Sequence, residues 1–349
     1  MHTNDSGGHT LACPDCRASL AADMTGYRCA SCRTLYRLED GILVFTPNST
    51  ALGEFSREEM EELLRAAAGS GWKAALATYV EQKNPAVLEL ILDSRRTSFL
   101  TLLPQPQGGI ALDFGCGFGG ISVQLARKYR QVFALDSGLE RLRFLNVIRK
   151  QERIGNIQAI HHENAASLPF ADRSIDLAVL VGVFEYLPLA FPDQPVRNVQ
   201  RRVLGELSRI LKPGGHLYIG TKNRFGWPYL KGAADHNRLR FGPVLPRLLA
   251  DWLTQRLYGK PYRIIVDSLP GYRGLLRGAG FREPRFYWPL PGYQVPDAFV
   301  PLWGGSDEAN APFDATMLPG WKGRAALALR AAGVLKYVVP HFSIVAQKP

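Results

Sequence analysis

Four cysteines near the start of the chain have the spacing of a metal site. They form two pairs, Cys13 with Cys16 and Cys29 with Cys32, in the segments CPDC and CASC. Each C-x-x-C pair places two thiolates on one tight turn, and two such turns supply the four soft ligands that tetrahedral zinc prefers. Four protein ligands close the coordination shell. We therefore expect a structural zinc ion whose binding drives the folding of this short segment.

A second chemical signature is the glycine-rich segment LDFGCGFGG at 112–120. Gly115, Gly117 and Gly119 follow an apolar run and precede the helical pattern ISVQLARKY. Without Cβ atoms they let the backbone approach a ligand closely, and the N-terminus of the helix offers free N–H donors. A glycine loop alone fits a dinucleotide, a nucleotide or tight packing. Cys116 inside the loop is expected to be a small packing residue and not a nucleophile.

Asp136 stands at the end of the next apolar run, QVFALD. An acid at this position can accept hydrogen bonds from both hydroxyls of a ribose. The alternative is an N-cap for the helix that starts in SGLERL. Both can hold for neighbouring groups, because Ser137 can cap the helix instead.

These residues need a scaffold in which strands and helices alternate. Apolar runs predict strands at 110–114, 131–136, 157–163, within 175–187 and at 216–223, with helices over 121–129, 138–152 and 196–211. The last helix is expected to stop at Pro213-Gly214-Gly215. A final strand, antiparallel to the others, is expected within 336–348. This alternation predicts an α/β fold with a doubly wound, mostly parallel sheet, which binds ligands at the carboxyl ends of its strands.

Local signals also divide the chain into three parts. We expect a zinc ribbon at 1–47, ending in a hairpin that turns at Asp40-Gly41. A helical linker with lead-in helices follows at 48–104, and its first helix, over 53–68, has Ser56 as N-cap. The third part, 105–349, is one large domain with cap insertions at about 224–262 and 286–335.

In their order, these segments resemble the class I S-adenosylmethionine-dependent methyltransferases over about residues 95–225. ALDFGCGFGG is similar to the glycine motif of that family and FALDSG to its acidic-loop motif. ENAASLPFADRSIDLAVLVGVFEYLP is similar to the stretch through the fourth strand, and ELSRILKPGGHLYIGTKNR to the helix, turn and fifth strand. A Rossmann dehydrogenase would not explain the LPF…ID and LKPGG segments. Residues 11–47 resemble the Trm112-like zinc ribbon found ahead of methyltransferase domains.

The resemblance implies a Rossmann-like methyltransferase fold and S-adenosylmethionine as the cofactor. The cofactor ligands that it implies are Asp113, Gly115, Cys116, Gly117, Gly119, Asp136, Ser137, Asn164, Ala165 and Val181. Asn164 stands where the family usually has an acid for the adenine amino group, and an amide carbonyl can still accept that hydrogen bond. His161 and His162, on the preceding strand, are interpreted as packed strand residues.

Methyl transfer needs a nucleophile aligned with the methyl group and, for a hydroxyl acceptor, a group that takes the proton. Candidates are Glu185 and Tyr186 after the fourth strand, and Asp235 with His236 in the segment 223–242. A histidine oriented by an acid would be a natural general base. The alternative is a surface loop that turns at GAADHN. Asn223 and Arg224 are further candidates for holding a substrate.

The segments 223–242 and 286–301 have a weaker resemblance to methyltransferases encoded among glycan-assembly genes. That resemblance implies a hydroxyl of a glycan, of a nucleotide-linked or lipid-linked sugar, or of a related secondary metabolite as acceptor. Aromatic residues of the second segment would then form a sugar-stacking wall or, alternatively, a packing element: Tyr287, Trp288 and Tyr293. RNA methylation, methylation of a quinone-type small molecule and a non-catalytic binding module remain open alternatives.

Positive charge is concentrated in the C-terminal portion. From Asp193 to Pro349 there are 23 Lys and Arg against 10 Asp and Glu, a net of +13, while residues 1–192 hold 19 against 21, a net of −2. The basic portion suits an anionic, carrier-linked substrate or contact with a membrane surface. Nucleic acid is not specifically indicated, because no Lys/Arg run is interleaved with aromatic residues. Without an apolar leader or spanning run, we expect a cytoplasmic protein. Its oligomeric state is not predicted.

Overall fold

The computed structural model describes residues 10–46, 56–83, 91, 93–104, 108–303, 318 and 320–349. The chain divides into two compact units: unit 1 comprises Met1–Val179 and Arg209–Gly215, and unit 2 comprises Leu180–Ser208 and His216–Pro349. This division differs from the boundaries at 47 and 104 inferred from the sequence, which stay predictions. Within the described ranges, no helix combines the length and the apolar character needed to cross a lipid bilayer.

Unit 1 begins with a ribbon of short antiparallel strands. β1 (Leu20–Asp23), β2 (Gly26–Cys29) and β3 (Leu35–Glu39) pair in that order, and β3 turns back into β4 (Ile42–Val44). The turn falls at Asp40 and Gly41, whose φ angles are 52° and 82°, which confirms the predicted hairpin. β4 also pairs in parallel with β7 (Ile157–His161), so the ribbon extends the main sheet of unit 1.

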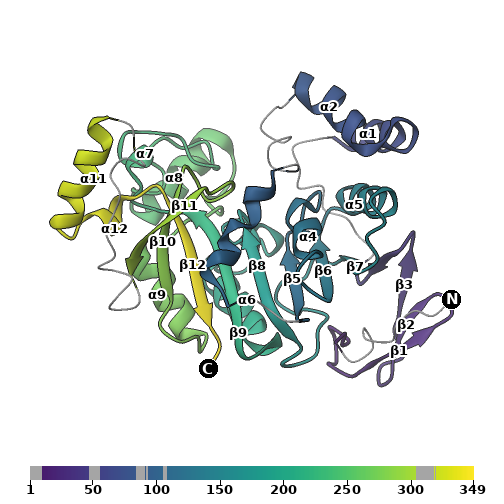
Figure 1. The fold of residues 1–349 in the computed structure, drawn as a ribbon. Helices are drawn as coiled ribbons and strands as arrows, with labels where there is room; N and C mark the ends of the chain where they lie inside the picture. The colour runs from purple at the N-terminus through teal and green to yellow at the C-terminus, as the bar shows by residue number, and fades with distance from the viewer. Residues whose placement is uncertain are drawn as a thin grey trace. The chain divides into compact units, whose positions relative to one another are not determined.

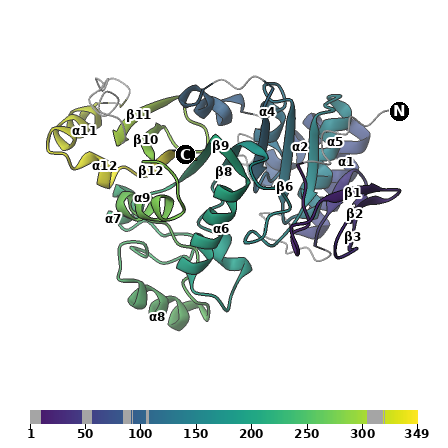
Figure 2. The ribbon, with the colours of Figure 1, turned by 90° about the horizontal axis from the view of Figure 1, so that it is seen from below.

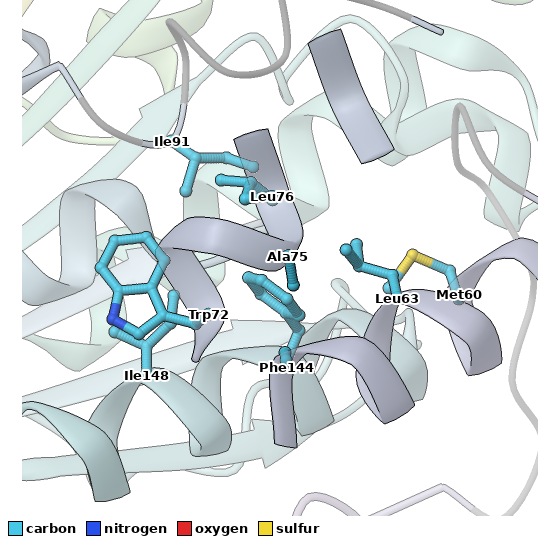
Figure 3. Close-up of a cluster of buried hydrophobic side chains, with 9 residues drawn as sticks. Met60, Leu63, Trp72, Ala75, Leu76, Ile91, Phe144 and Ile148 are labelled. Atoms are coloured by element: carbon cyan, nitrogen blue, oxygen red, sulfur yellow. The ribbon is translucent and has the colours of Figure 1, made fainter. Parts of the chain in front are cut away.

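Two helices follow the ribbon and cover α5 (Leu139–Gln151). α1 (Arg57–Ser70) starts with the predicted N-cap Ser56, which forms a capping box with Glu59; residues 53–55 of the predicted helix lie outside the described residues. α2 (Trp72–Lys83) comes next, and the 3-10 helix η1 (Ser94–Leu102) ends two residues before Pro104. Figure 3 shows the buried cluster that joins these helices to α5, which includes Met60, Leu63, Trp72, Leu76, Phe144 and Ile148. Burial contributes about 1.5–3 kcal/mol for each such side chain, so this cluster holds α1 and α2 on α5.

The main sheet of unit 1 is parallel, in the order β4-β7-β6-β5-β8 (Figure 1). β5 (Ile110–Phe114) and β6 (Gln131–Asp136) have the predicted bounds, whereas β7 is two residues shorter than predicted. β8 (Ile175–Val181) continues from unit 1 into unit 2. α4 (Gly120–Leu125) links β5 to β6, and α5 links β6 to β7. Because parallel strands end at one edge, the glycine loop after β5 and Asp136 at the end of β6 share that edge.

Unit 2 carries an antiparallel sheet in the order β9-β12-β10-β11. Its strands are β9 (Leu211–Lys222), β10 (Arg285–Leu290), β11 (Ala298–Trp303) and β12 (His341–Gln347). Its helices are η2 (Leu187–Ala190), α6 (Val196–Ile210), α7 (Trp227–Leu230), α8 (Arg247–Tyr258), α9 (Leu269–Gly278), α11 (Trp321–Ala331) and α12 (Leu335–Val338). The antiparallel last strand is confirmed, and Figure 2 shows α8 away from the strands of this unit.

One predicted boundary in this region is wrong. β9 begins at Leu211, ahead of the predicted start at 216, whereas α6 ends at Ile210, one residue before the predicted end of the helix. The residue before a proline favours an extended backbone, so Lys212 already belongs to the strand. The cap insertion expected at about 286–335 stays a prediction, and its first residues form β10, which pairs with β12 inside the sheet.

Candidate functional site

The four ribbon cysteines converge on one point. Their sulfur atoms all lie within 4.8 Å of one another, with Cys13 Sγ 3.6 Å from Cys32 Sγ and Cys16 Sγ 3.4 Å from Cys29 Sγ. Tetrahedral zinc with Zn–S bonds of about 2.3 Å needs sulfurs about 3.8 Å apart, so the set fits one ion. The hydroxyl oxygen of Tyr36 lies 3.0 Å from Cys13 Sγ and its proton goes to Asp15, an outer contact typical of metal sites.

The ribbon contacts the loop that follows β7. The ring of Phe45 lies 4.6 Å from that of Tyr36 and 5.9 Å from that of His162, measured between centroids. Nε2 of His162 lies 2.9 Å from the carbonyl oxygens of both Asn164 and Ser167. Ser167 in turn donates to the carbonyl of Pro14, inside the first cysteine turn. The loop expected to meet the adenine is therefore held from the metal side.

The glycines of the loop after β5 serve two different purposes. Gly115, Gly117 and Gly119 all have positive φ, at 75°, 54° and 84°. A Cβ on Gly119 would lie 2.3 Å from Cδ1 of Leu145, so this glycine is required for packing against α5. A Cβ on Gly117 would meet nothing within 4 Å among the described atoms, so the backbone there faces open space. Close approach of a ligand is therefore an argument for Gly117 and not for Gly119.

Asp136 ties the loop after β6 to the glycine loop. Its Oδ2 accepts the N–H of Gly117 at 2.8 Å, and its Oδ1 accepts the N–H of Gly138 at 2.7 Å. The guanidinium of Arg141 lies 2.9 Å from Oδ1. The N-cap of α5 is Gly138 and has no side-chain cap, so the suggestion that Ser137 caps this helix is wrong.

Asp113 and Cys116 lie buried beside this loop. Ser122 Oγ donates to Asp113 Oδ2 at 2.6 Å. Burial raises the pKa of Asp113 to about 6, and the Ser122 hydrogen bond opposes that rise. Burial also raises the pKa of the Cys116 thiol well above its usual value, in line with the expectation that Cys116 packs and does not attack.

The residues after β7 differ in exposure. Asn164 is exposed, and its side-chain Oδ1 accepts the N–H of Ala166 at 3.2 Å. Ala165 is buried next to it. His161 is buried, with Nε2 3.0 Å from the carbonyl oxygen of Ser137. His161 and His162 thus pack at the end of β7, in line with their interpretation as packed residues. His161 also positions the loop after β6, and His162 positions the loop after β7.

In unit 2, Glu185 is a carboxyl buried without full pairing. It has no exposed surface, and Oε2 accepts from the hydroxyl of Thr221 at 3.3 Å. Oε1 has no hydrogen-bond partner among the described residues. Burial raises the pKa of Glu185, so this group has a reason to hold a proton. An unpaired buried carboxyl oxygen is costly in a structural role and is common in ligand sites.

Lys222, the last residue of β9, is a cation that acts electrostatically on this carboxyl. Its Nζ lies 2.5 Å from Nε2 of His236, and the ring of Tyr186 is 5.0 Å from the ring of His236 between centroids. Burial lowers the pKa of Lys222, while Glu185 and Asp235 oppose that shift. Partial burial and the Lys222 ammonium lower the pKa of His236 to about 4. Because His236 as a whole is exposed, we attribute more of this lowering of its pKa to the Lys222 ammonium than to burial.

Asp235 does not orient His236, which corrects the predicted pair. Its Oδ1 accepts the N–H groups of Asn237 and Leu239, at 2.9 and 3.0 Å. Its Oδ2 accepts from the hydroxyl of Tyr262 at 2.5 Å and from the side-chain amide of Asn237. Among the described residues no hydrogen bond joins Asp235 to His236. Backbone N–H groups two to four residues away satisfy an Asp carboxylate more readily than a neighbouring imidazole does. Asp235 therefore stabilises the turn of its own loop.

Comparison with known proteins gives the family. A family model described as a methyltransferase domain matches residues 112–219. Ubiquinone/menaquinone biosynthesis C-methyltransferase UbiE of Syntrophotalea carbinolica is 31% identical over 192 residues, which cover 51% of this chain and 70% of that protein. This chain belongs to the S-adenosylmethionine-dependent methyltransferases.

Further relatives of this methyltransferase differ in the atom that they methylate. Ubiquinone biosynthesis O-methyltransferase of Aliivibrio fischeri is 25% identical over 207 residues, covering 54% of this chain and 80% of that protein. Dimethylglycine N-methyltransferase of Parasynechococcus marenigrum is 36% identical over 116 residues, covering 32% and 37%. A solved S-adenosylmethionine-dependent methyltransferase from Methanosarcina mazei has a TM-score of 0.44 and 20% identity, covering 74% of this chain and 99% of that one.

The loops of the methyltransferase fit S-adenosylmethionine. The open space at Gly117 admits a ligand against the backbone. Each carboxylate oxygen can accept two hydrogen bonds, and Oδ2 of Asp136 accepts only one of those described, so it can take one ribose hydroxyl. Oδ1 already has Gly138 and Arg141, so a second hydroxyl there must displace the Arg141 side chain.

Several residues expected near the acceptor have structural roles instead. The amide of Asn223 donates to the carbonyls of Tyr337 and Val339, and the guanidinium of Arg224 donates to the carbonyls of Pro243 and Leu245. Both residues therefore tie chain segments together, which corrects their expected role in holding substrate. Tyr287 and Trp288 are buried in β10, so the packing alternative holds for them and the sugar-stacking wall does not.

Sequence reasoning missed Lys222 and His341. His341, at the start of β12, stands opposite Lys222 in the antiparallel register, and burial with the nearby ammonium lowers its pKa to about 4. Its ring lies 5.2 Å from that of Tyr293, which packs close to Gly182 and Gly220. No local pattern marks a lysine at the end of a strand. The signal was only its place at the carboxyl end of the predicted fifth strand.

Unit 1 also contains a cavity of about 500 Å³ that is separate from these loops. Residues of α2, α4 and the end of α5 line it, among them Lys73, Gln124, Arg127 and Glu152. Neither Gly117 nor Asp136 is among its lining residues, so it lies apart from the loops expected to bind the cofactor.

Val181, at the end of β8, packs near Gly220 within unit 2.

Proposed function

We propose that this methyltransferase transfers a methyl group to an acidic hydroxyl, of the phenol type, on a small or carrier-linked acceptor. The observation that carries the proposal is the cluster of Glu185, Lys222 and His236 at the ends of β8 and β9. It combines the ammonium of Lys222, a neutral ring nitrogen of His236 and the buried carboxyl of Glu185, whose Oε1 has no partner among the described residues. Such a set can hold an oxygen acceptor and stabilise the negative charge on it.

The remaining site residues receive proposed roles by their positions. We assign the cofactor to the loops that carry Asp113, Gly115, Gly117, Gly119 and Asp136, with Asn164 and Ala165 near the adenine. When bound, S-adenosylmethionine supplies a methyl group on a sulfonium: the acceptor oxygen forms the new C–O bond, and the electron pair of the broken C–S bond stays on sulfur. The structural metal belongs to Cys13, Cys16, Cys29 and Cys32.

The pKa values of the cluster favour an acidic hydroxyl. With its pKa lowered to about 4, His236 is neutral near pH 7 but a weak base. A weak base can take the proton of a phenol, whose pKa of about 10 falls further beside an ammonium, more readily than that of a sugar hydroxyl. Lys222 would hold the resulting oxyanion. The name of the Aliivibrio relative, ubiquinone biosynthesis O-methyltransferase, agrees with this acceptor class.

A glycan hydroxyl is the second candidate, favoured by the basic C-terminal portion. Its net charge of +13 from Asp193 onward suits an anionic, phosphate-bearing carrier. All three aromatic residues expected to stack on a sugar are buried, two of them in β10, so this candidate has lost its most specific support.

The test uses purified protein, methyl-labelled S-adenosylmethionine and an extract of the source cells, split into RNA, lipid, polymer and small-molecule pools. Label in an O-methylated aromatic compound of the lipid or small-molecule pool would support the proposal. Label in the polymer pool or in a nucleotide-linked sugar would favour the glycan candidate, and label in RNA would overturn both. Asp136→Ala, which removes the proposed ribose ligand, is the control that must lose the label in every pool.

A further inference from the structure

Helix α8 of unit 2 exposes large apolar side chains to solvent. The exposed fraction is 89% for Leu248, 62% for Trp252 and 58% for Leu257. Leu249 and Tyr258 of the same helix are exposed as well, and so is Phe241 in the loop before it. Leu248 and Trp252 are four residues apart, so they lie on the same face of the helix. Single exposed apolar residues are ordinary, but a group of this size marks an interaction surface.

The opposite face of α8 packs against the rest of unit 2. Ala250 and Thr254 are buried, and Ala250 joins a cluster with Leu239, Tyr262 and Ile265. Asp251 accepts the backbone N–H of Tyr262, and the hydroxyl of Tyr258 donates to the carbonyl of Arg238. α8 and residues 235–242 thus form one fixed surface, and Figure 2 shows α8 on the outside of the unit.

This surface is strongly basic. Residues 231–263 contain seven Lys and Arg against two Asp, a net charge of +5. The exposed cations are Lys231, Arg238, Arg240, Arg256 and Lys260. Among the described residues no ion pair joins these five cations to an acid, and Asp235 and Asp251 accept hydrogen bonds from neutral groups of the segment. The two acids leave the segment with an excess of positive charge around the apolar face.

We propose that α8 docks in the surface of an anionic lipid bilayer, with Leu248, Leu249 and Trp252 entering the headgroup region and the surrounding cations contacting lipid phosphates. A helix with an apolar face that contains Trp and Leu, bordered by Lys and Arg, is suited to that interface. A second copy of this chain would bring the same positive charge against itself. Nucleic acid would pair with the cations but would offer no partner for the exposed leucines. The inference does not depend on which acceptor is methylated.

The test measures co-sedimentation of the full-length protein with vesicles of phosphatidylcholine alone or with phosphatidylglycerol. We expect binding that requires phosphatidylglycerol and weakens with salt. Trp252→Glu should weaken it at least tenfold, because it removes an inserted ring and adds a negative charge. The double variant Arg256→Gln, Lys260→Gln should weaken it by roughly fivefold for each cation removed. Trp321→Glu is the matched control, because Trp321 on α11 has a similar exposed fraction of 64%.

Three results would overturn the proposal. The first is equal sedimentation with and without phosphatidylglycerol. The second is a Trp321→Glu variant that loses as much binding as Trp252→Glu. The third is a wild-type dimer in solution that Trp252→Glu converts to monomer, since the face would then join two copies. All these substitutions are at exposed sites, where changes in the free energy of unfolding are usually small, so unfolding would not imitate the effect.

Discussion

The loops of unit 1 that we assign to the cofactor and the polar cluster of unit 2 are built in different ways. Asp136 bonds to Gly117 and Gly138, and Asp113 bonds to Ser122, so these contacts all fall within one continuous segment, 113–138. The cluster of unit 2 instead gathers Glu185, Lys222, His236 and His341 from separate strands and loops. A binding loop for a common cofactor can be encoded locally, whereas a site for a particular acceptor depends on how distant segments meet.

The two regions also differ in charge. Unit 1 presents the carboxyl groups of Asp113 and Asp136, which accept hydrogen bonds from a hydroxyl, from backbone N–H groups and from the guanidinium of Arg141. Unit 2 presents a lysine between two histidines whose pKa values are lowered to about 4. Acidic groups suit the hydroxyls of a ribose, and a cation with neutral rings suits an acceptor that develops negative charge. If cofactor binding depends on unit 1 and methyl transfer on unit 2, variants of the two regions should show different defects.

The largest effect is expected at Lys222. Lys222→Met should lower kcat by about 10²–10³ while leaving the Kd for S-adenosylmethionine within about twofold, because the ammonium would act on the acceptor alone. Asp136→Ala should show the reverse, a weaker Kd as its main defect. Isothermal titration with the cofactor and initial rates at saturating cofactor measure the two quantities.

Lys222→Arg is the control for charge. It keeps the cation, and a guanidinium stays protonated above pH 12. Since burial lowers the pKa of Lys222, wild-type activity should fall with rising pH before the usual lysine pKa of about 10.4 is reached, and Lys222→Arg should move that fall to higher pH. A Lys222→Met variant with weakened cofactor binding and unchanged kcat would remove Lys222 from the acceptor site.

The same contrast explains what the sequence could and could not predict. The Asp40-Gly41 hairpin, the Ser56 cap and the bounds of β5 and β6 follow from signals within a few residues, and they are confirmed. The parallel pairing of β4 with β7 and the position of His341 opposite Lys222 depend on contacts between distant segments, which leave no periodic pattern. Asp235 was misassigned for a different reason: its bonds to Asn237 are local turn bonds, which the alternative of a turn at GAADHN already allowed, and its bond to Tyr262 joins a distant segment.

The next effect separates two glycines of the cofactor loop. Gly119→Ala should lower the free energy of unfolding by about 2–5 kcal/mol, because a Cβ would clash with Leu145 and the residue has a left-handed backbone. Gly117→Ala should cost only about 1–2 kcal/mol for its positive φ and should mainly weaken cofactor binding. Urea unfolding and cofactor titration on both variants measure the split. Unchanged affinity in Gly117→Ala would mean that the open space there is not used by the cofactor.

A third effect concerns pH and Asp113. Its pKa is raised to about 6 in the folded protein and is about 3.9 in an unfolded chain. Between these values the folded state binds a proton that the unfolded state releases, so the free energy of unfolding falls as pH rises from 4 to 6 and is level above that. Asp113→Asn stays neutral and should lack this slope, which amounts to about 1–3 kcal/mol. Urea midpoints at several pH values test it, and parallel curves for the two proteins would contradict the assignment.

The smallest effect concerns the ribbon. It tests whether the loops assigned to the cofactor keep their conformation without support from outside residues 113–138. Removing the metal should unfold the cysteine turns and release the contacts of Phe45 with His162 and of Pro14 with Ser167. The loop that carries Asn164 would then lose its support, and we expect the Kd for S-adenosylmethionine to weaken by about tenfold. Titration after chelation, and again after zinc is restored, measures this change. His162→Phe keeps the metal but loses the bonds to Asn164 and Ser167, so it should reproduce part of the loss. If chelation lowered kcat and left the Kd unchanged, the ribbon would serve the acceptor and not the cofactor, and the division between the two regions would have to be redrawn.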